Sequence, residues 1–267
     1  MTPQYDLALS DIRQGVTEWR MWGRQGWSDV RVRYRRTAFG PFWATLSLGI
    51  FMVSFSVVWA NLWKLDVREY LSFVSAGMLS WTLISAIITE GTTTFISAES
   101  LIKSMGFPYT VLSCAVVWRN LIIFFHNIVA YLGVMVFCGV PVTWNSLLIV
   151  PGLLLIALNG IWVTTLLGMS GARYRDIQQL IVSILQILMF VTPIFWSPDQ
   201  ISGRAALVLI LVDFNPLLHY VEIVRNPLLG KPTSFLNWEM ALLGTLIGWC
   251  LTLYVFSRFR RRVAYWL

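Results

Sequence analysis

The chain has 267 residues, of which 57% are hydrophobic and 12% are charged, and its formal net charge is +7. A soluble domain carries about a quarter charged residues, so this chain has too few polar side chains to cover a water-exposed surface. A basic balance indicates nucleic-acid binding when Lys and Arg cluster on a soluble face. Here the arginines lie at the edges of apolar segments, which is typical of membrane orientation and argues against nucleic acid as a partner.

Residues 1–37 are expected to form a cytoplasmic amphipathic interface helix. The segment has no short apolar core of the kind found in a cleavable signal peptide. Its apolar residues recur at helical steps and share one face, as Ile12, Val16, Trp19 and Trp22 do. Arginines occupy another face, a combination typical of a helix lying in the membrane interface. Two roles fit: a simple anchor, or an anchor that also braces a cytoplasmic partner.

Six apolar segments are long enough to cross a membrane, since about 20 helical residues span ~30 Å of hydrocarbon. They cover residues 38–63, 70–96, 111–138, 147–171, 177–196 and 238–257. We therefore expect an all-α, polytopic membrane protein with a six-helix transmembrane domain over residues 38–257.

The segment before the last span, residues 198–237, is expected to form an outer re-entrant gate loop. Its apolar run at 205–212 is too short to span, and Asp213, Asn215 and Pro216 follow at once. Non-helical backbone at membrane depth is tolerated only where protein or a water-filled cavity covers it, so one or two short re-entrant helices are expected. The alternative is a seventh span, which would place the C-terminus on the side opposite the N-terminus.

The distribution of Lys and Arg predicts the orientation, because basic residues are enriched in cytoplasmic loops. With six spans, one side receives the N-terminal segment, the loops 97–110 and 172–176, and a basic tail at 258–267. That side carries most of the Lys and Arg residues, whereas the other side has Lys64, Arg68, Arg204, Arg225 and Lys231. Both termini are therefore expected in the cytoplasm.

The cytoplasmic loop 97–108 is expected to form a short helix with exposed apolar residues. Leu101, Ile102 and Met105 are at helical spacing, and the loop has too few apolar residues to bury itself. Such a helix suits docking into a groove on another protein. The alternative is a solvated connector.

Two charged residues lie inside predicted spans, where charge is costly and often functional. Glu90 is near the cytoplasmic end of the second span, and Arg119 lies at similar depth in the third. Because these spans are antiparallel neighbours, we expect the two side chains to pair or to share a buried hydrogen-bond network. The alternative is that each extends separately to the cytoplasmic interface.

An aromatic stripe follows the first span, where Phe51, Phe55, Trp59 and Trp63 recur at steps of four on one face. Two interpretations fit it. The stripe can lie against lipid or a neighbouring helix, or it can form a pore wall. The apolar C–H faces of sugar rings lie flat on aromatic rings, so such a wall would bind each sugar weakly and let a polymer slide.

Catalytic and metal-binding motifs are not found in the sequence. Gly230-Lys231 lacks the glycine that a phosphate-binding loop requires five residues earlier. No G-x-S-x-G elbow occurs, and the cysteines and histidines have no metal-ligand spacing. The chain is therefore expected not to be an enzyme and to hold no cofactor of its own. If transport uses ATP, another chain must hydrolyse it.

Four short motifs in order along the chain resemble the ABC-2 type permeases of polysaccharide export. Residues 33–43 (Arg-Tyr-Arg-Arg-Thr-Ala-Phe-Gly-Pro-Phe-Trp) lead into the first span, with Thr37 and Phe39 where the family pattern has Ser and Leu. Residues 174–177 (Tyr-Arg-Asp-Ile) open the fifth span and 192–196 (Thr-Pro-Ile-Phe-Trp) close it. Before the last span come Asn215-Pro216, Arg225 and Leu228-Leu229-Gly230.

The resemblance implies a homodimer of this chain working with two copies of a separate cytoplasmic ATPase, which binds ATP and Mg. The substrate it implies is a lipid-linked polysaccharide, foremost the O-antigen of lipopolysaccharide, moved from cytoplasm to periplasm across a bacterial inner (plasma) membrane. The alternatives are export of another substrate, such as capsule, teichoic acid, galactan, a small lipid or a drug. A less favoured alternative is a membrane-embedded transferase acting on lipid-linked sugars, which would need carboxylates or histidines converging on one face, and the spans offer mainly Glu90. An ion channel would need charged or carbonyl-lined constrictions, and the sequence shows no clear segment for one.

The resemblance also assigns candidate roles to residues. The loop after the second span would contact the ATPase through Glu99, Leu101, Ile102, Lys103, Met105 and Phe107. The polymer path would follow the dimer interface near spans one and five, lined by Phe51, Phe55, Trp59, Trp63, Phe190 and Phe195. Gate or structural roles go to Glu90, Arg119, Arg175, Asp176, Pro193, Asn215, Pro216 and Arg225. The interface helix would approach the first span through Arg33, Tyr34, Arg35 and Arg36.

Overall fold

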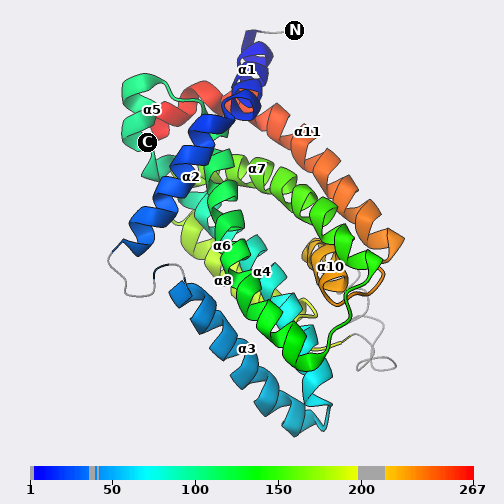
Figure 1. Cartoon of the computed structure of the whole chain (residues 1–267). Helices are drawn as coiled ribbons and strands as arrows, with labels where there is room; N and C mark the ends of the chain where they lie inside the picture. Colours follow the sequence, from blue (N-terminus) through cyan, green and yellow to red (C-terminus); the bar gives the residue numbers. More distant parts are fainter. Residues whose placement is uncertain (1–2, 36–39, 41, 198–213) are drawn as a thin grey trace.

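A computed structural model describes the chain except for residues 1–2, 36–39, 41 and 198–213 (Figure 1). The described residues form helices, joined by short connections, and no strand occurs among them. In chain order the elements are α1 Pro3–Thr17, α2 Trp19–Tyr34, α3 Phe42–Trp63, α4 Val67–Ser97, α5 Glu99–Met105, α6 Tyr109–Cys138, the 3-10 helix η1 Trp144–Leu148, α7 Ile149–Arg173, α8 Ile177–Val191, α10 Pro216–Leu228 and α11 Phe235–Trp266.

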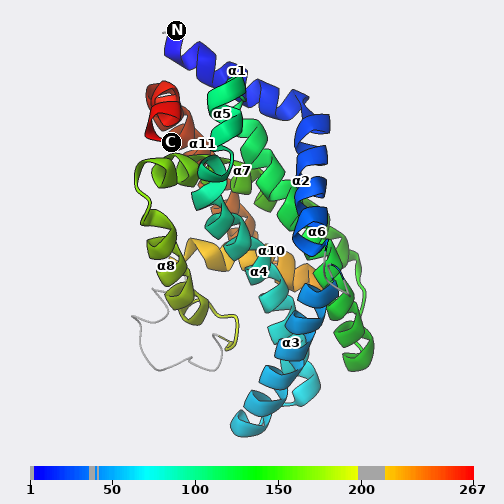
Figure 2. The same cartoon turned by 90° about the vertical axis from the view of Figure 1, so that its left-hand side faces the viewer.

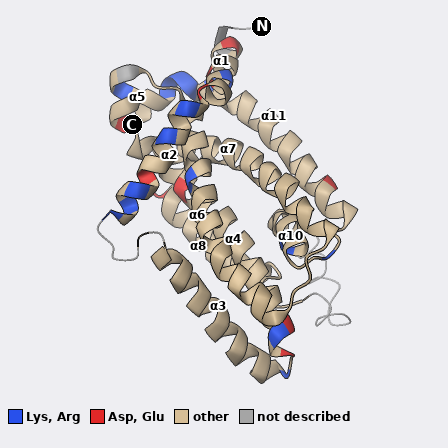
Figure 3. Cartoon of the chain, viewed as in Figure 1, with Lys and Arg blue, Asp and Glu red and all other residues tan. Residues whose placement is uncertain are grey.

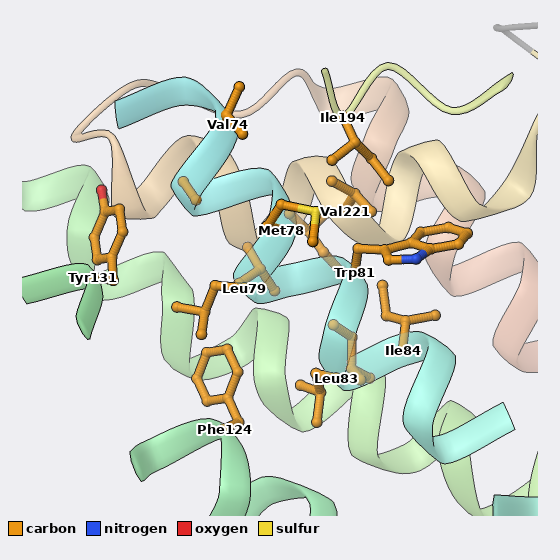
Figure 4. Close-up of a cluster of buried hydrophobic side chains, with 14 of the residues drawn as sticks. Val74, Met78, Leu79, Trp81, Leu83, Ile84, Phe124, Tyr131, Ile194 and Val221 are labelled. Atoms are coloured by element: carbon orange, nitrogen blue, oxygen red, sulfur yellow. The ribbon is translucent and has the colours of Figure 1, made fainter. Parts of the chain in front are cut away.

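Helix α4 is the central element of the bundle. It packs against α6 and α7 most extensively and also contacts α3, α8 and α10. Its residues are apolar or small on nearly every side, as expected of a helix surrounded by other helices. Figure 4 shows Val74, Met78, Leu79 and Trp81 of α4 among side chains that come from neighbouring segments.

Small residues allow the closest approaches between helices, as is common where helices pack in membranes. Gly171 of α7 faces the backbone of α4 so closely that a Cβ atom there would lie 1.9 Å from the carbonyl oxygen of Thr92. Gly160, three turns earlier on α7, would place a Cβ atom 2.9 Å from Val117 and 3.1 Å from Ile87. The α4–α7 contact therefore depends on glycine at Gly171.

Five helices are long and apolar enough to cross a membrane: α3, α4, α6, α11 and the continuous η1–α7 segment Trp144–Arg173. They correspond to five of the six predicted spans. The predicted fifth span at 177–196 is shorter in the structure, because α8 has 15 residues and ends at Val191. Thr192 is extended, with ψ 132°, as the ring of Pro193 favours for the residue before it. A helix of 15 residues is about 22 Å long, which is less than the hydrocarbon thickness.

One end of the bundle extends beyond the length that a membrane requires. Helices α4, α6 and α11 have 31, 30 and 32 residues, or about 45 Å each, against ~30 Å of hydrocarbon. Charged residues are concentrated at the end that carries α1, α2 and α5 (Figure 3). The predicted basic tail at 258–267 is mostly not a separate segment, because α11 continues as a helix to Trp266.

The interface segment is two helices rather than the single helix predicted. Glu18 interrupts it with a non-helical ψ of 42°, and Figure 2 shows α1 and α2 meeting at an angle. Both helices contact α6, and α1 also contacts α11.

At the opposite end of the bundle, α10 is a short helix within the predicted re-entrant loop, packed against α4, α7 and α11. Residues 198–213 of that loop lie outside the description, so the number of short helices there stays a prediction.

Candidate functional site

The aromatic stripe of α3 is a continuous row of neighbouring rings, of which Phe51 and Phe55 are stacked and the later pairs are tilted. The ring centroids of Phe51 and Phe55 lie 5.6 Å apart, those of Phe55 and Trp59 5.7 Å, and those of Trp59 and Trp63 4.9 Å. Phe51 and Trp63 are exposed, and the two rings between them are half-buried. Because α3 is an uninterrupted helix, residues four apart lie one above another, and the row of rings extends along most of the span.

The segment after α8 packs against the aromatic stripe through Phe195. Phe195 lies 4.5 Å from Phe55 between centroids and is itself 5% exposed. Its backbone oxygen accepts a hydrogen bond from Tyr70 Oη at 2.7 Å. Phe190, at the end of α8, is 64% exposed and lies 6.0 Å from Phe195. Phe195 was expected to line the channel with Phe190, but its burial leaves Phe190 as the exposed ring of that pair.

Four charged residues of α2, α4 and α6 form an ionic cluster: Asp29, Arg33, Glu90 and Arg119. Arg119 donates to Glu90 through Nε at 3.0 Å and Nη2 at 2.7 Å, which confirms the predicted pairing. Arg119 also contacts Asp29 at 2.5 Å, and Arg33 contacts Glu90 at 2.7 Å. The amide of Asn120 donates to Glu90 at 2.8 Å.

The ionic cluster joins α2 to the α4–α6 hairpin, which the sequence did not reveal. Asp29 and Arg33 are four residues apart on α2 and therefore face the same way. A polar cavity of about 340 Å³ beside the cluster is bounded by Gln25, Thr93 and Ser97 together with residues of the cluster. Of the predicted approach to the first span, Tyr34 is half-buried and Arg35 is exposed. Arg36 lies outside the described residues.

A second buried acid holds α1 in place. Asp11 is 0% exposed and accepts hydrogen bonds from the backbone N–H of Thr110 at 2.9 Å and of Tyr109 at 3.3 Å. Arg260 of α11 donates to the same carboxylate through Nε at 2.8 Å. Asp11 thus caps the first turn of α6 and binds α11, although it lies in neither helix. Free N–H groups and a positive partial charge at the start of a helix stabilise such a carboxylate.

The face of α1 and α2 that meets the bundle carries one acid and mainly small residues. Asp11 and Gly15 of α1 and Gly26 and Val30 of α2 are buried, and the step of four within each pair places both of its residues on one helical face. At Gly26 a Cβ atom would lie 2.9 Å from the carbonyl oxygen of Ala115. This spacing is the signal in the sequence that would have located the docking face.

The predicted apolar face of the interface segment is divided between two environments. Val16 and Trp19 are exposed, as an interfacial face requires. Trp22 instead turns toward α6, where its ring lies 5.9 Å from Trp118 and its indole N–H donates to the Gly15 oxygen at 2.9 Å. The sequence pattern grouped these residues because it treated α1 and α2 as one straight helix.

Helix α5 forms the predicted short helix in the loop 97–108. Leu101 is at the border of exposure, but Ile102 is 4% exposed and packs in a cluster with Ala8 of α1 and Phe95 of α4. The expectation that Ile102 is an exposed docking residue is therefore wrong, because this side of α5 faces the bundle, where α5 contacts α4 and α11. Phe107 is half-buried against the same cluster. The side chain of Met105 lies outside the description.

The exposed side of α5 carries charge. Lys103 Nζ donates to Glu99 at 2.7 Å, and this bond and the lysine charge hold the pKa of Glu99 below its usual range. Arg175, in the connection between α7 and α8, adds a smaller effect of the same sign and donates to the backbone oxygen of Leu267 at 3.4 Å. Asp176 precedes α8 and does not cap it through its side chain. The α7–α8 connection therefore lies beside α5 and the end of α11.

Four of the eight residues predicted to have gate or structural roles, Pro193, Asn215, Pro216 and Arg225, come together at the opposite end. Arg225 of α10 is 2% exposed, donates to the carbonyl oxygen of Pro193 and pairs with Glu222. Its guanidinium lies 4.3 Å from the ring centroid of Phe73. Asn215 caps α10 by accepting from the N–H of Leu217 at 3.0 Å, and its amide donates to Thr192 at 2.8 Å.

Pro216 occupies the first turn of α10, where its missing N–H costs nothing. The motif that ends α8 and the motif that begins α10 are therefore joined by two side chains, those of Asn215 and Arg225. Segments separated in the sequence by the undescribed residues 198–213 thus form one unit.

Comparisons with known proteins place the chain in a family. The sequence model of the ABC-2 type transporter family matches residues 25–229. A relative from Myxococcus xanthus, "O-antigen export system permease protein RfbA", is 25% identical over 191 residues, covering 71% of this chain and 73% of the relative. Two proteins of the same name from Klebsiella pneumoniae are 20% and 22% identical over 243 and 244 residues, covering 88% of this chain and 90% of each relative.

The matched residues include the part of α2 that carries Asp29 and Arg33 and the aromatic stripe of α3. They also include α10 and the segment after α8 to which it is hydrogen-bonded. It covers well over half of the chain, and the long apolar helices are those of a multi-pass membrane protein. This chain belongs to the ABC-2 type transporter family.

Proposed function

We propose that this protein is the transmembrane permease subunit of an ABC transporter that exports a lipid-linked polysaccharide, with O-antigen as the first candidate. Two copies would enclose the path, and a separate ATPase would supply the energy. The names of the relatives support an O-antigen permease. Export would run from cytoplasm to periplasm across the inner membrane, with both termini in the cytoplasm, as the distribution of Lys and Arg favours.

The observation that carries the proposal is the aromatic stripe. Its rings follow one another at 4.9 to 5.7 Å along α3, and the outermost rings are exposed in the single chain. A polymer of sugars can lie on such a surface by its C–H faces and advance in small steps, because each contact is weak and the next resembles the last. A wall of fixed charges would bind a polymer too strongly at single points.

A homodimer accounts for the apolar surface that one chain leaves open beside the aromatic stripe. Exposed apolar residues on α8 recur at steps of three and four: Leu180, Ile184, Ile187 and Phe190. These residues and the aromatic stripe are brought together at Phe195, which contacts Phe55. Two copies meeting near α3 and α8 would cover the apolar surface and enclose the aromatic one.

The ATPase would bind at the end that carries α1, α2 and α5. The exposed Glu99 and Lys103 of α5 and the exposed arginines of α2 are the groups available there. Ile102 packs α5 against the buried cluster that includes Phe95 of α4, and Asp11 attaches α1 to α6 and α11. A displacement of α5 or α1 would therefore be transmitted to the spans. Any ATP and Mg would then be held by the partner subunit.

The test is export in a strain that lacks the chromosomal copy of this chain. Wild type should restore surface polysaccharide, and the purified protein should carry an ATP-hydrolysing subunit. Trp59→Ala should reduce export at least several-fold and leave lipid-linked polymer in the cytoplasm, whereas Trp144→Ala, at an 88% exposed site on η1, should not. Full export by Trp59→Ala, or export without any ATPase, would refute the proposal.

A further inference from the structure

An apolar groove runs between α3 and α6 on the side of α3 away from the aromatic stripe. Its volume is about 880 Å³. Leu71 and Val134, both buried, form the floor. The walls are Leu46, Ile50, Val53 and Val57 of α3 and Val129, Gly133 and Phe137 of α6. Apart from Thr45 and Ser54, every residue lining the groove is apolar or glycine.

The groove exists because α3 and α6 touch at one end and separate toward the other. Near the start of α3, Thr45 Oγ1 donates to Asn127 at 3.2 Å and closes the groove. At Gly49 a Cβ atom would lie 3.5 Å from Ala130. One turn further along α6, a Cβ atom at Gly133 would have nothing within 4 Å. The two glycines thus leave room for an occupant that no side chain of the described residues fills.

From Leu46 to Val57 the groove is about 16 Å long, close to half of the ~30 Å hydrocarbon thickness. That length fits one acyl chain of a single leaflet. Both walls are membrane-length apolar helices, so the medium outside the groove is lipid. Filling an apolar gap with a chain is favourable by about 0.8 kcal/mol for each buried CH₂ group.

The open end of the groove carries a positive charge. The guanidinium of Arg68 lies 5.8 Å from the ring centroid of Phe137, which lines the groove, and Val67 beside it lines the groove as well. Arg68 is exposed, and no carboxylate among the residues that the structure describes pairs with it. It lies where α4 begins, at the membrane surface opposite α5. A guanidinium at this position suits the phosphate of a lipid whose chain enters the groove.

We propose that the groove between α3 and α6 binds an anionic phospholipid from the leaflet at the α3–α4 turn, with one acyl chain along Gly49 and Gly133 and the phosphate at Arg68. Val53 of the groove and Phe55 of the aromatic stripe are two residues apart, which places them about 200° apart around α3. The lipid therefore supports α3 from the side opposite its rings. The proposal depends on the membrane location alone and not on the substrate.

The test uses phosphatidylglycerol with a photoreactive diazirine in its acyl chain, in vesicles of phosphatidylcholine containing the purified protein. Wild type should be labelled mainly on residues 46–57 and 129–137. Gly133→Leu, which fills open space, should reduce labelling there at least fivefold at an unchanged melting temperature, and Gly133→Ala should not. Ile50→Trp fills the groove from the α3 wall if the first variant does not fold.

The headgroup is tested with unlabelled competitors. Phosphatidylglycerol should displace the probe better than phosphatidylcholine does, and Arg68→Gln should abolish that preference. Lys231→Gln, an exposed basic residue on the same side, should leave it intact. Labelling spread evenly over the exposed face of α11, no effect of either groove-filling variant, or cross-links between two protein copies through the groove would overturn the proposal.

Discussion

The two central residues of the ionic cluster, Glu90 and Arg119, each have two opposite partners. Glu90 binds Arg119 and Arg33, and Arg119 binds Glu90 and Asp29. The side chains of Glu90 and Arg119 are 21% and 14% exposed, so water compensates little for a lost contact. Removing one member of a buried pair costs more than the pair contributes, because the other charge stays buried without its partner.

We therefore expect Glu90→Gln to lower stability by about 2–4 kcal/mol, seen as a fall of the melting temperature in detergent. The same change at Glu99, an exposed partner of Lys103, should cost under about 1 kcal/mol and is the matched control. Exchanging Glu90 and Arg119 should not restore stability, since it would set an arginine against Arg33 and a glutamate against Asp29. Full rescue by the exchange would mean that the outer members of the cluster contribute nothing.

At the scale of elements, the bundle is set by contacts that leave no room for an added methyl group. Gly171→Ala would place Cβ 1.9 Å from a backbone oxygen of α4, and backbone cannot move aside as a side chain can. We expect a loss of about 1–3 kcal/mol. Gly133→Ala has open space and should be neutral or stabilising by up to ~1 kcal/mol, from helix propensity. Thermal unfolding of both variants checks the difference, and equal melting temperatures would contradict the packing.

The attachment of α1 depends on one carboxylate shared by α6 and α11. Asp11→Asn removes the charge that Arg260 binds and weakens the cap of α6. We expect α1 to detach locally, with hydrogen exchange in residues 3–17 at least tenfold faster while the spans remain protected. Asp6→Asn, an exposed site on the same helix, should behave as wild type. Unchanged exchange in Asp11→Asn would show that apolar contacts alone hold α1.

For the whole molecule, the sequence predicted what depends on composition and local geometry. Long apolar segments predict spans, and five of the six are long continuous helices. The pairing of Glu90 with Arg119 followed from two antiparallel helices joined by a short loop, which brings similar depths together. Pro193, Asn215 and Arg225 belong to separate sequence motifs with expected gate or structural roles, and the structure joins them by hydrogen bonds.

What the sequence did not predict depends on contacts between distant segments. Asp11 and Arg260 are separated by nearly the whole chain, and no local pattern relates them. The prediction for Ile102 is wrong because α5 has only seven residues, so its contacts with α4 and α11 decide which face is buried. The end of the fifth span was misplaced at Trp196, although Pro193 gave the local signal for an earlier end.

The assembly of two copies is the feature of the whole molecule on which the proposed function depends. If α8 lies at the dimer interface, Ile187→Cys in a background with Cys138 and Cys250 replaced by serine should form a disulfide-linked dimer in native membranes. Ile187 is 65% exposed in the single chain. In a two-fold dimer whose axis passes near α8, Ile187 would lie close to the same residue of the second copy. Retaining Cys250, which is exposed on α11, without the Ile187→Cys change should give no dimer, because α11 lies away from the aromatic stripe. Leu62→Cys tests the same interface from α3. If Cys250 forms a cross-link and neither Ile187→Cys nor Leu62→Cys does, the interface lies elsewhere, and the aromatic stripe faces lipid instead of a channel.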